Sequence, residues 1–155
     1  MSPHRENADS LWLVREGKSQ PQCSPGQPMK CDSRIRLTHL QSNQNLHSSR
    51  DFHSPLSGQQ EVHLYGNNGE GDFNDDWILV CKEGAMRWRH FWQRDSSQYI
   101  QLKHAETGAF LASSYALSFG SNTPRIENHL EASGAFSATS SSTNFQVSLG
   151  IHVLH

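Results

Sequence analysis

The stretch Ile35-Arg36-Leu37-Thr38-His39 alternates apolar and polar side chains, which is the pattern of a half-buried β-strand. The same alternation returns 65 positions later (35 to 100) in Ile100-Gln101-Leu102-Lys103-His104. Clusters of Gly, Pro, Ser and Asn separate the strand-like stretches, and no stretch keeps a helical period with caps. We therefore expect an all-β sandwich or barrel of many short strands joined by polar turns.

The strand pattern belongs to an internal repeat. An aromatic residue followed two positions later by an aliphatic one occurs at Trp12, Trp77 and Phe145, which are 65 and 68 positions apart (12 to 77, 77 to 145). This spacing, with several short strands in each unit, indicates three-fold pseudo-symmetry and a closed barrel with few unpaired sheet edges. We expect the three aromatic side chains at equivalent positions in the core, where each would bury a large area.

Composition excludes several classes of protein. The 155 residues suit one domain, and the formal net charge of −2 gives no basic field to attract nucleic acid or an anionic membrane. No apolar run approaches the roughly 20 residues that a membrane span needs. Residues 1–10 are polar and lack the apolar segment of a signal peptide, so no signal peptide is visible there, and we expect a disordered tail.

Several segments resemble a known family. Those that look like the opening of an MIR repeat are Gly26–Cys31, Ile35–His39 and Asn45–Ser48. The run Ser54-Pro55-Leu56-Ser57-Gly58-Gln59-Gln60-Glu61-Val62, followed by a glycine-rich acidic loop up to Trp77, is more specific. Together these segments resemble the stromal cell-derived factor 2 family more closely than the MIR segment of protein O-mannosyltransferases.

The resemblance implies a β-trefoil of MIR repeats whose first repeat is truncated. The expected boundaries are a tail over residues 1–10 and a trefoil over 11–155, divided into the end of repeat 1 (11–25), repeat 2 (26–85) and repeat 3 (86–155). Repeat 3 departs from the family pattern, because no Ser-Gly-Gln precedes Glu131 and because Phe145 stands where the family has Trp.

The resemblance also implies a function. It implies residence in the lumen of the endoplasmic reticulum, association with a J-domain co-chaperone, and a role in protein quality control. We therefore expect a non-enzymatic binding module that holds protein partners or glycosylated clients, with glycans as a further ligand class and with no cofactor. The alternatives are the MIR fragment of a protein O-mannosyltransferase and a stand-alone glycan-binding trefoil lectin.

Polar side chains at turn–strand junctions form the candidate ligand-binding group. Its members are His47, Ser48, Ser57, Gln59, Gln60 and Glu61. Imidazole, hydroxyl, amide and carboxylate groups on a rigid β-scaffold suit contacts with glycan hydroxyls or with the backbone of an extended peptide. The competing interpretation is that Gln59, Gln60 and Glu61 only satisfy the backbone of their own turn.

The chain has three cysteines: Cys23, Cys31 and Cys81. The repeat register places Cys31 at the start of repeat 2 and Cys81 at its end, so we expect these two to pair and Cys23 to be a free thiol. The bond requires an oxidising lumen, and all three thiols would stay reduced in the cytosol.

An acidic loop raises the possibility of calcium binding. Asp72, Asn74, Asp76 and Glu83 match positions 1, 3, 5 and 12 of an EF-hand loop, but Trp77 occupies the position that must be glycine. We interpret the segment as a solvated loop before a core strand and expect no metal site.

The run Met86–Arg94 alternates basic and aromatic residues, as grooves for single-stranded nucleic acid do. The same alternation is typical of a half-exposed strand, and we prefer that interpretation because the chain is net negative.

His39 and His104 share one repeat position and are expected to be structural. No nucleophile motif, phosphate-binding loop or His-Glu-x-x-His motif occurs, so we expect no catalytic residues.

Overall fold

The computed structural model describes residues 10–24, 29–81, 99–123 and 126–146, which form an all-β fold. The strands are β1 (Trp12–Glu16), β2 (Arg34–His39), β3 (Gln44–His53), β4 (Gln60–Tyr65), β5 (Trp77–Cys81), β6 (Ile100–His104), β7 (Phe110–Ser118) and β8 (Leu130–Ala135). The short 3-10 helix η2 (Phe73–Asp75) lies just before β5. In this part of the chain no helix is both long and apolar enough to cross a membrane.

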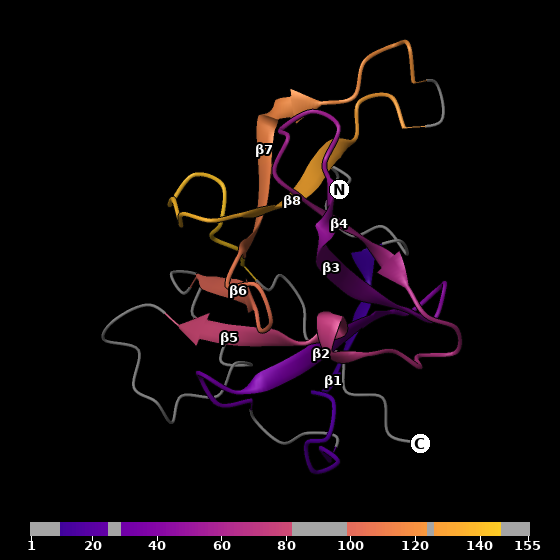
Figure 1. Ribbon diagram of the computed structural model, residues 1–155, viewed down its shortest axis with the longest axis vertical. Coiled ribbons are helices and arrows are strands. Elements are labelled where there is room, and N and C mark those ends of the chain that lie inside the picture. The colour runs from indigo at the N-terminus through magenta and orange to yellow at the C-terminus, as the bar shows by residue number, and fades with distance from the viewer. Residues whose placement is uncertain (1–9, 25–28, 82–98, 124–125, 147–155) are drawn as a thin grey trace.

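The strands close into a ring. Their order is β1-β2-β3-β4-β8-β7-β6-β5, and a further antiparallel pairing between β2 and β5 closes the seven strands from β2 to β5 into a ring. Strand β1 lies outside the ring and pairs with β2 (Figure 1). Closure gives the ring strands partners on both sides, so few edges remain open among the described residues.

The internal repeat predicted from the sequence is confirmed by the strand registers. Trp12 lies opposite His39 in the β1–β2 pair, and Trp77 lies opposite His104 in the β5–β6 pair. In both pairs the ring centroids are 5.1 Å apart. Phe145 bridges to Ile100, just as Trp77 pairs with Ile35 in the preceding unit. The sequence boundaries proposed for the three repeats remain a prediction.

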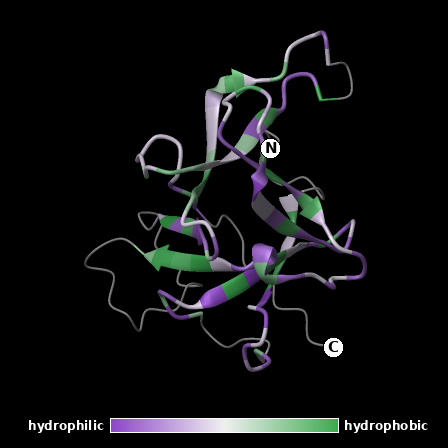
Figure 2. Ribbon diagram, viewed as in Figure 1, coloured by the Kyte–Doolittle hydropathy of each residue, from purple (hydrophilic) through white to green (hydrophobic). Residues whose placement is uncertain are grey.

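The core is centred on Trp77, whose side chain is fully buried. Leucine and isoleucine side chains surround it, and its indole Nε1 donates a hydrogen bond to the carbonyl oxygen of Leu46 at 2.9 Å. Apolar residues concentrate along β5, whereas the residues of the connecting loops are mostly polar (Figure 2). The indole therefore combines a large buried area with a satisfied polar group.

The other two aromatics of the repeat are less buried than Trp77. Phe145 is half-buried against the core. Trp12 is 37% exposed, so the prediction that it occupies a core position was wrong. The reason is its location on β1, which in the described part of the chain pairs with β2 alone. A repeat position is therefore buried only where neighbouring units cover it.

His104 is a structural histidine, as its repeat position suggested. The side chain is fully buried and its Nε2 lies 2.9 Å from the carbonyl oxygen of Asn74. Its Nδ1 lies 2.8 Å from Oγ1 of Thr107. Burial lowers the pKa of His104, although the contact with the Asn74 carbonyl opposes that shift. Both ring nitrogens are thus used to hold loops around the core.

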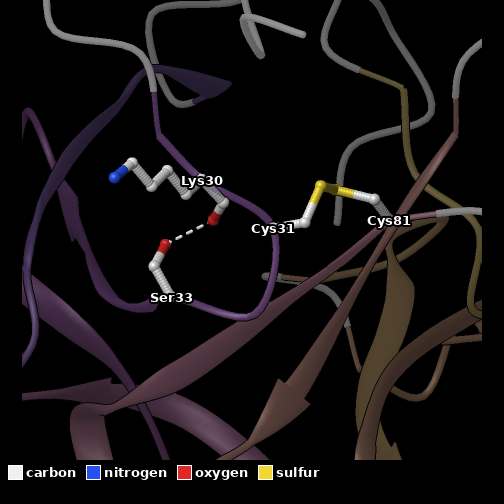
Figure 3. The surroundings of a disulfide bond; sticks show 4 residues. All are labelled: Lys30, Cys31, Ser33 and Cys81. Carbon is white, nitrogen blue, oxygen red and sulfur yellow. Dashed lines mark hydrogen bonds between the residues drawn. A yellow bond between two sulfur atoms is a disulfide. The ribbon is translucent and has the colours of Figure 1, made fainter. Parts of the chain in front are cut away.

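A disulfide bond joins Cys31 to Cys81, the two cysteines that the repeat register pairs. Their Cα atoms are 5.6 Å apart, and the bond links the turn before β2 to the end of β5 (Figure 3). The turn is also held by a hydrogen bond of 2.6 Å from Ser33 Oγ to the carbonyl oxygen of Lys30. Cys23 is a free thiol, and its Sγ donates to the Glu16 carboxylate at 3.1 Å.

Candidate functional site

Three of the predicted ligand-binding residues tie β3 to β4. Ser48 Oγ donates to the backbone carbonyl of Glu61 at 2.6 Å, and Gln60 Nε2 donates to Ser48 Oγ at the same distance. Ser48 and Gln60 are buried. Ser48 and Gln60 therefore hold the hairpin together, although the Gln60 side chain bonds the Ser48 hydroxyl and not, as the competing interpretation has it, the backbone of its own turn.

The loop between β3 and β4 closes around a carboxylate from β8. Glu131 is buried and accepts hydrogen bonds from the backbone N–H groups of Leu56, at 2.6 Å, and Ser57, at 3.0 Å. Gln59 Oε1 accepts from Ser133 Oγ at 2.9 Å. The contribution of Glu131 was missed at the sequence level, although it holds the same repeat position as Glu61. Ser57 and Gln59 therefore lie where repeat 2 meets repeat 3.

His47 points away from Ser48. Successive side chains of a strand project to opposite faces, so the two predicted neighbours cannot share one pocket. His47 is buried, and its Nδ1 lies 2.9 Å from Oδ1 of Asp75 and 3.8 Å from Oδ1 of Asp72. The structure thus separates the predicted group and gives His47 two acidic neighbours.

His47 belongs to a ring–acid cluster, which we define as His47, His63, Tyr65, Asp72 and Asp75. The His47 ring centroid lies 4.9 Å from that of His63 and 4.5 Å from that of Tyr65. The Tyr65 residue is 48% exposed and the Asp72 side chain 50% exposed, whereas Asp75 is fully buried. The cluster therefore has a buried carboxylate, Asp75, at its bottom. Its exposed rim consists of the Tyr65 ring and the Asp72 carboxylate.

Local sequence explains how the acids reach His47. Asp72 is the N-cap of η2 and Asp75 is its third residue, and together they form a capping box. Asp75 Oδ2 also accepts from Asn45 Nδ2 at 3.2 Å. A Cβ on Gly71 would lie 1.6 Å from this oxygen, so the close approach requires glycine at this position. The Gly-Asp-x-x-Asp spacing is a sequence signal for the capping box, but it does not reveal the contact of Asp75 with His47.

The loop does not have the arrangement of an EF-hand. Asp72 Oδ1 accepts from the Asn74 N–H at 2.8 Å, while Asp76 Oδ1 accepts from the Lys18 N–H at 2.8 Å and Asp76 Oδ2 faces Arg34. These side chains serve separate partners and do not converge on one point. Glu83 lies outside the described residues.

The acidic loop is not solvated throughout, because Asp75 and Asp76 are fully buried, and that part of the sequence interpretation was wrong. The burial of charge is tolerated because hydrogen-bond donors face both carboxylates and a cation also faces Asp76. The other charged stretch singled out from the sequence, Met86–Arg94, falls in the undescribed segment 82–98.

Three atoms of the cluster could hold a metal ion by distance alone. One ligand atom each from His47, Asp72 and Asp75 lies within 4.8 Å of the others. Hydrogen bonds from Asn45 and from the backbone N–H groups of Asp72 and Asn74 already engage the two carboxylates. These hydrogen bonds give both carboxylates a role within the fold, and Asp72, whose side chain is 50% exposed, can also accept hydrogen bonds from outside the chain.

His63 supplies a neutral ring to the exposed side of the cluster. Burial and the neighbouring charge of His47 lower the pKa of His63, although Glu61 and Asp75 oppose the shift. Its Nδ1 is buried without a hydrogen-bond partner and lies 3.9 Å from Glu61 Oε1. A neutral imidazole beside Tyr65 extends the ring surface without adding positive charge.

The next repeat lacks this cluster. In the β3–β4 pair His47 lies opposite His63 and Asn45 opposite Tyr65. The equivalent β7–β8 pairs are Ala112 opposite Ser133 and Phe110 opposite Ala135. At the position of Asp75 (75 to 143) stands Thr143, whose Oγ1 donates to the Thr139 carbonyl at 2.7 Å. The fold therefore forms without the ring–acid cluster, and the cluster is a particular feature of repeat 2.

The hydroxyl–imidazole contacts in the described residues belong to turns. His39 Nδ1 lies 2.9 Å from Ser42 Oγ, and His104 Nδ1 lies 2.8 Å from Thr107 Oγ1. Both pairs are three residues apart at equivalent repeat positions, so they brace the turn between two strands.

The closed ring and the repeated registers are those of a β-trefoil MIR protein. The MIR-domain family profile matches residues 2–118, and the chain belongs to this family. Within the family the chain is similar to stromal cell-derived factor 2 from Homo sapiens, with 42% identity over 107 residues. That match covers 69% of this chain and 46% of the human protein, so the chain spans about half the length of the curated relatives it matches. A Dictyostelium discoideum stromal cell-derived factor 2-like protein is 36% identical over 109 residues, covering 70% of this chain and 47% of that protein.

Solved structures agree on the fold. A Caenorhabditis elegans protein of unknown function superposes with a TM-score of 0.75 and 32% identity, covering 92% of this chain and 72% of its own. The stromal cell-derived factor 2-like protein of Arabidopsis thaliana gives the same TM-score at 24% identity, covering 93% of this chain and 74% of that one. A third match is the S. cerevisiae protein O-mannosyltransferase complex bound to the sugar donor, with a TM-score of 0.67 and 25% identity. This match covers 92% of our chain and 19% of that enzyme chain. The family resemblance drawn from the sequence is confirmed.

Proposed function

We propose that the chain is a non-catalytic MIR binding module that holds a protein partner or a glycosylated client in the lumen of the endoplasmic reticulum. The observation that carries the proposal is the exposed rim of the ring–acid cluster. This rim is present in repeat 2 and absent from the equivalent positions of repeat 3. Repeat 3 folds without equivalent side chains, so the rim of repeat 2 is a candidate for binding a ligand.

The chemistry of the rim suits a sugar ring or an aromatic side chain. Tyr65, which is 48% exposed, offers an aromatic ring on which an apolar ring surface can stack, and the His63 ring lies beside it with the centroids 6.4 Å apart. The half-exposed Asp72 carboxylate accepts hydrogen bonds from hydroxyl or amide groups, because a carboxylate has about four lone-pair sites. The η2 capping box holds Asp72 in place beside the rings.

The disulfide supports the proposed compartment. Bonds of this kind persist in oxidising compartments such as the lumen of the endoplasmic reticulum and are rare in the cytosol. The Cys31–Cys81 bond thus favours the lumen, where the resemblance to stromal cell-derived factor 2 suggests an endoplasmic-reticulum J-domain co-chaperone as the protein partner.

The second candidate function is that of an MIR segment within a protein O-mannosyltransferase. The match to the yeast enzyme complex favours it, whereas the sequence matches to stromal cell-derived factor 2 proteins favour the adaptor. A stand-alone lectin is the third. Binding by the isolated chain distinguishes the three functions. An adaptor binds a polypeptide and a lectin binds a glycan. An O-mannosyltransferase segment binds neither without the other domains of the enzyme.

Replacing Tyr65 by alanine is expected to weaken ligand binding about fivefold, because stacking on an exposed ring contributes on the order of 1 kcal/mol. The measurement is a titration of the purified chain with a glycopeptide that carries a high-mannose glycan, and with the same peptide without its glycan. Tyr115→Ala is the matched control, because Tyr115 is a tyrosine 80% exposed on β7, outside the cluster.

Each arm of the titration has a clear meaning. Stronger binding of the glycosylated peptide identifies a glycan-dependent client site, and equal binding of both peptides identifies a polypeptide site. Equal losses in the Tyr65→Ala and Tyr115→Ala variants would show that the ring–acid cluster is not the binding site.

A further inference from the structure

A polar groove lies beside residues 68–71, the segment that comes just before Asp72 of the ring–acid cluster. It has a volume of about 560 Å³, within the range of ligand sites, and is bounded by residues 15–20, Arg36 and residues 68–71. None of the ring–acid residues lines it. Its lining holds three cations, Arg15, Lys18 and Arg36, and two acids, Glu16 and Glu70.

Two of the charged residues that line the groove, Arg36 and Glu16, neutralise each other. Arg36 is buried, its Nε donates to the backbone carbonyl of Glu16 at 2.9 Å, and its Nη2 lies 3.9 Å from Glu16 Oε1. Burial alone would raise the pKa of Glu16, but hydrogen bonds from its own N–H and from the Cys23 amide and thiol, together with the charge of Arg15, hold that pKa below its usual value. Glu16 is therefore ionised and faces Arg36.

Arg15 and Lys18 have no comparable partner. Among the described residues neither cation lies within ion-pair distance of a carboxylate. Arg15 lies directly opposite Arg36 in the β1–β2 pair, and like charges in that arrangement repel. The Lys18 ammonium donates to the carbonyl oxygen of Gly71 at 2.9 Å, and an ammonium has three donors, so it can also bind a ligand.

Gly69 leaves room for the Arg15 guanidinium. Gly69 has a φ of +74°, and a Cβ at this position would lie 2.6 Å from Arg15 Nη1. Arg15 Nη1 therefore lies close to the bare backbone of Gly69, and both residues line the groove. The planar fork of a guanidinium binds a carboxylate through two parallel hydrogen bonds.

We propose that the groove binds an acidic segment of a partner polypeptide, with one carboxylate held between Arg15 and Lys18. A single negative charge suits the site because Glu16 and Glu70 would repel a dianion. The amide side chains of Gln20 and Asn68 on the groove wall can bind the backbone of an extended peptide. This site goes beyond the proposed function, since it shares no residue with the ring–acid cluster.

The test is fluorescence anisotropy of the 155-residue chain with a labelled peptide of alternating glutamate and serine, compared with its glutamine counterpart. The acidic peptide should bind at least about tenfold more tightly, and rising salt should reduce the difference. Arg15→Ala should remove about tenfold in affinity, and Arg15→Lys a part of it, because lysine keeps the charge and loses the fork. Glu70→Gln should raise the affinity severalfold by removing a competing carboxylate.

Controls separate this site from other causes. Arg50→Ala removes the same charge from an exposed position outside the groove and should leave the affinity within about twofold. Tyr65→Ala should bind the acidic peptide normally, and Arg15→Ala should bind the glycopeptide normally, so each proposal can fail alone. Equal binding of the acidic and neutral peptides, or equal losses in Arg15→Ala and Arg50→Ala, would overturn the assignment. Displacement of the peptide by inorganic phosphate at a similar concentration would also overturn it, in favour of a free oxyanion site.

Discussion

Replacing Trp77 by alanine is expected to lower the free energy of unfolding by about 3–5 kcal/mol, because it leaves a large cavity at the centre of the ring. The side chain is fully buried, and its loss also leaves the Leu46 carbonyl oxygen without its indole donor. Urea unfolding followed by circular dichroism measures the change.

Trp12→Ala is the matched control for this substitution. Trp12 holds the equivalent repeat position opposite His39 but is 37% exposed, so its replacement should cost only about 1 kcal/mol. Similar losses in the two variants would contradict a core in which burial differs between equivalent repeat positions.

Replacing Cys31 by serine is expected to cost about 4 kcal/mol under oxidising conditions, because the bond to Cys81 closes a loop with a sequence separation of 50. Cys81→Ser should cost the same, and the two losses should not add. Cys23→Ser should cost under about 1 kcal/mol, since Cys23 is outside the disulfide and the serine hydroxyl can still donate a hydrogen bond to Glu16.

A reductant gives an independent check on the disulfide. In its presence the wild-type chain and the Cys31→Ser variant should unfold at nearly the same urea concentration. Peptide mapping that recovers a Cys23–Cys31 bond from the oxidised chain would contradict the pairing seen in the structure.

The sequence predicted the framework of the fold well. The alternating stretch 35–39 lies within β2, the stretch 100–104 coincides with β6, and their aromatic partners recur in the same register. Periodicity succeeds because each strand has one face toward the core, and that face must be apolar. Trp12 shows the limit, because repeat position alone does not tell which neighbours cover a side chain.

The candidate site could be predicted only in part. His47 was identified, but its predicted neighbours Ser48 and Gln60 belong to the opposite face and to the hairpin itself. Its real acidic partner, Asp75, comes from η2, 28 positions further along the chain (47 to 75). No local pattern links the two residues, because the contact depends on how the loop folds back over β3.

The polar groove was not predicted from the sequence at all. Arg15 and Lys18 stand in no motif, and Gly69, about 50 positions further along the chain, stands in the glycine-rich loop that was used only for the family resemblance. Arg15 has no ion-pair partner because of where the carboxylates of the described residues lie in the fold. The net charge of the sequence does not reveal these positions.

The central claim is that repeat 2 carries a ligand site that repeat 3 lacks. The most direct test is amide NMR spectroscopy of the isotope-labelled chain during titration with the glycopeptide. We predict that the signals of His63, Tyr65 and Asp72 shift in proportion to binding, while those of Ser133 and Ala135 at the equivalent positions stay in place. Shifts confined to repeat 3, or no shift in either repeat at saturating glycopeptide, would contradict the claim.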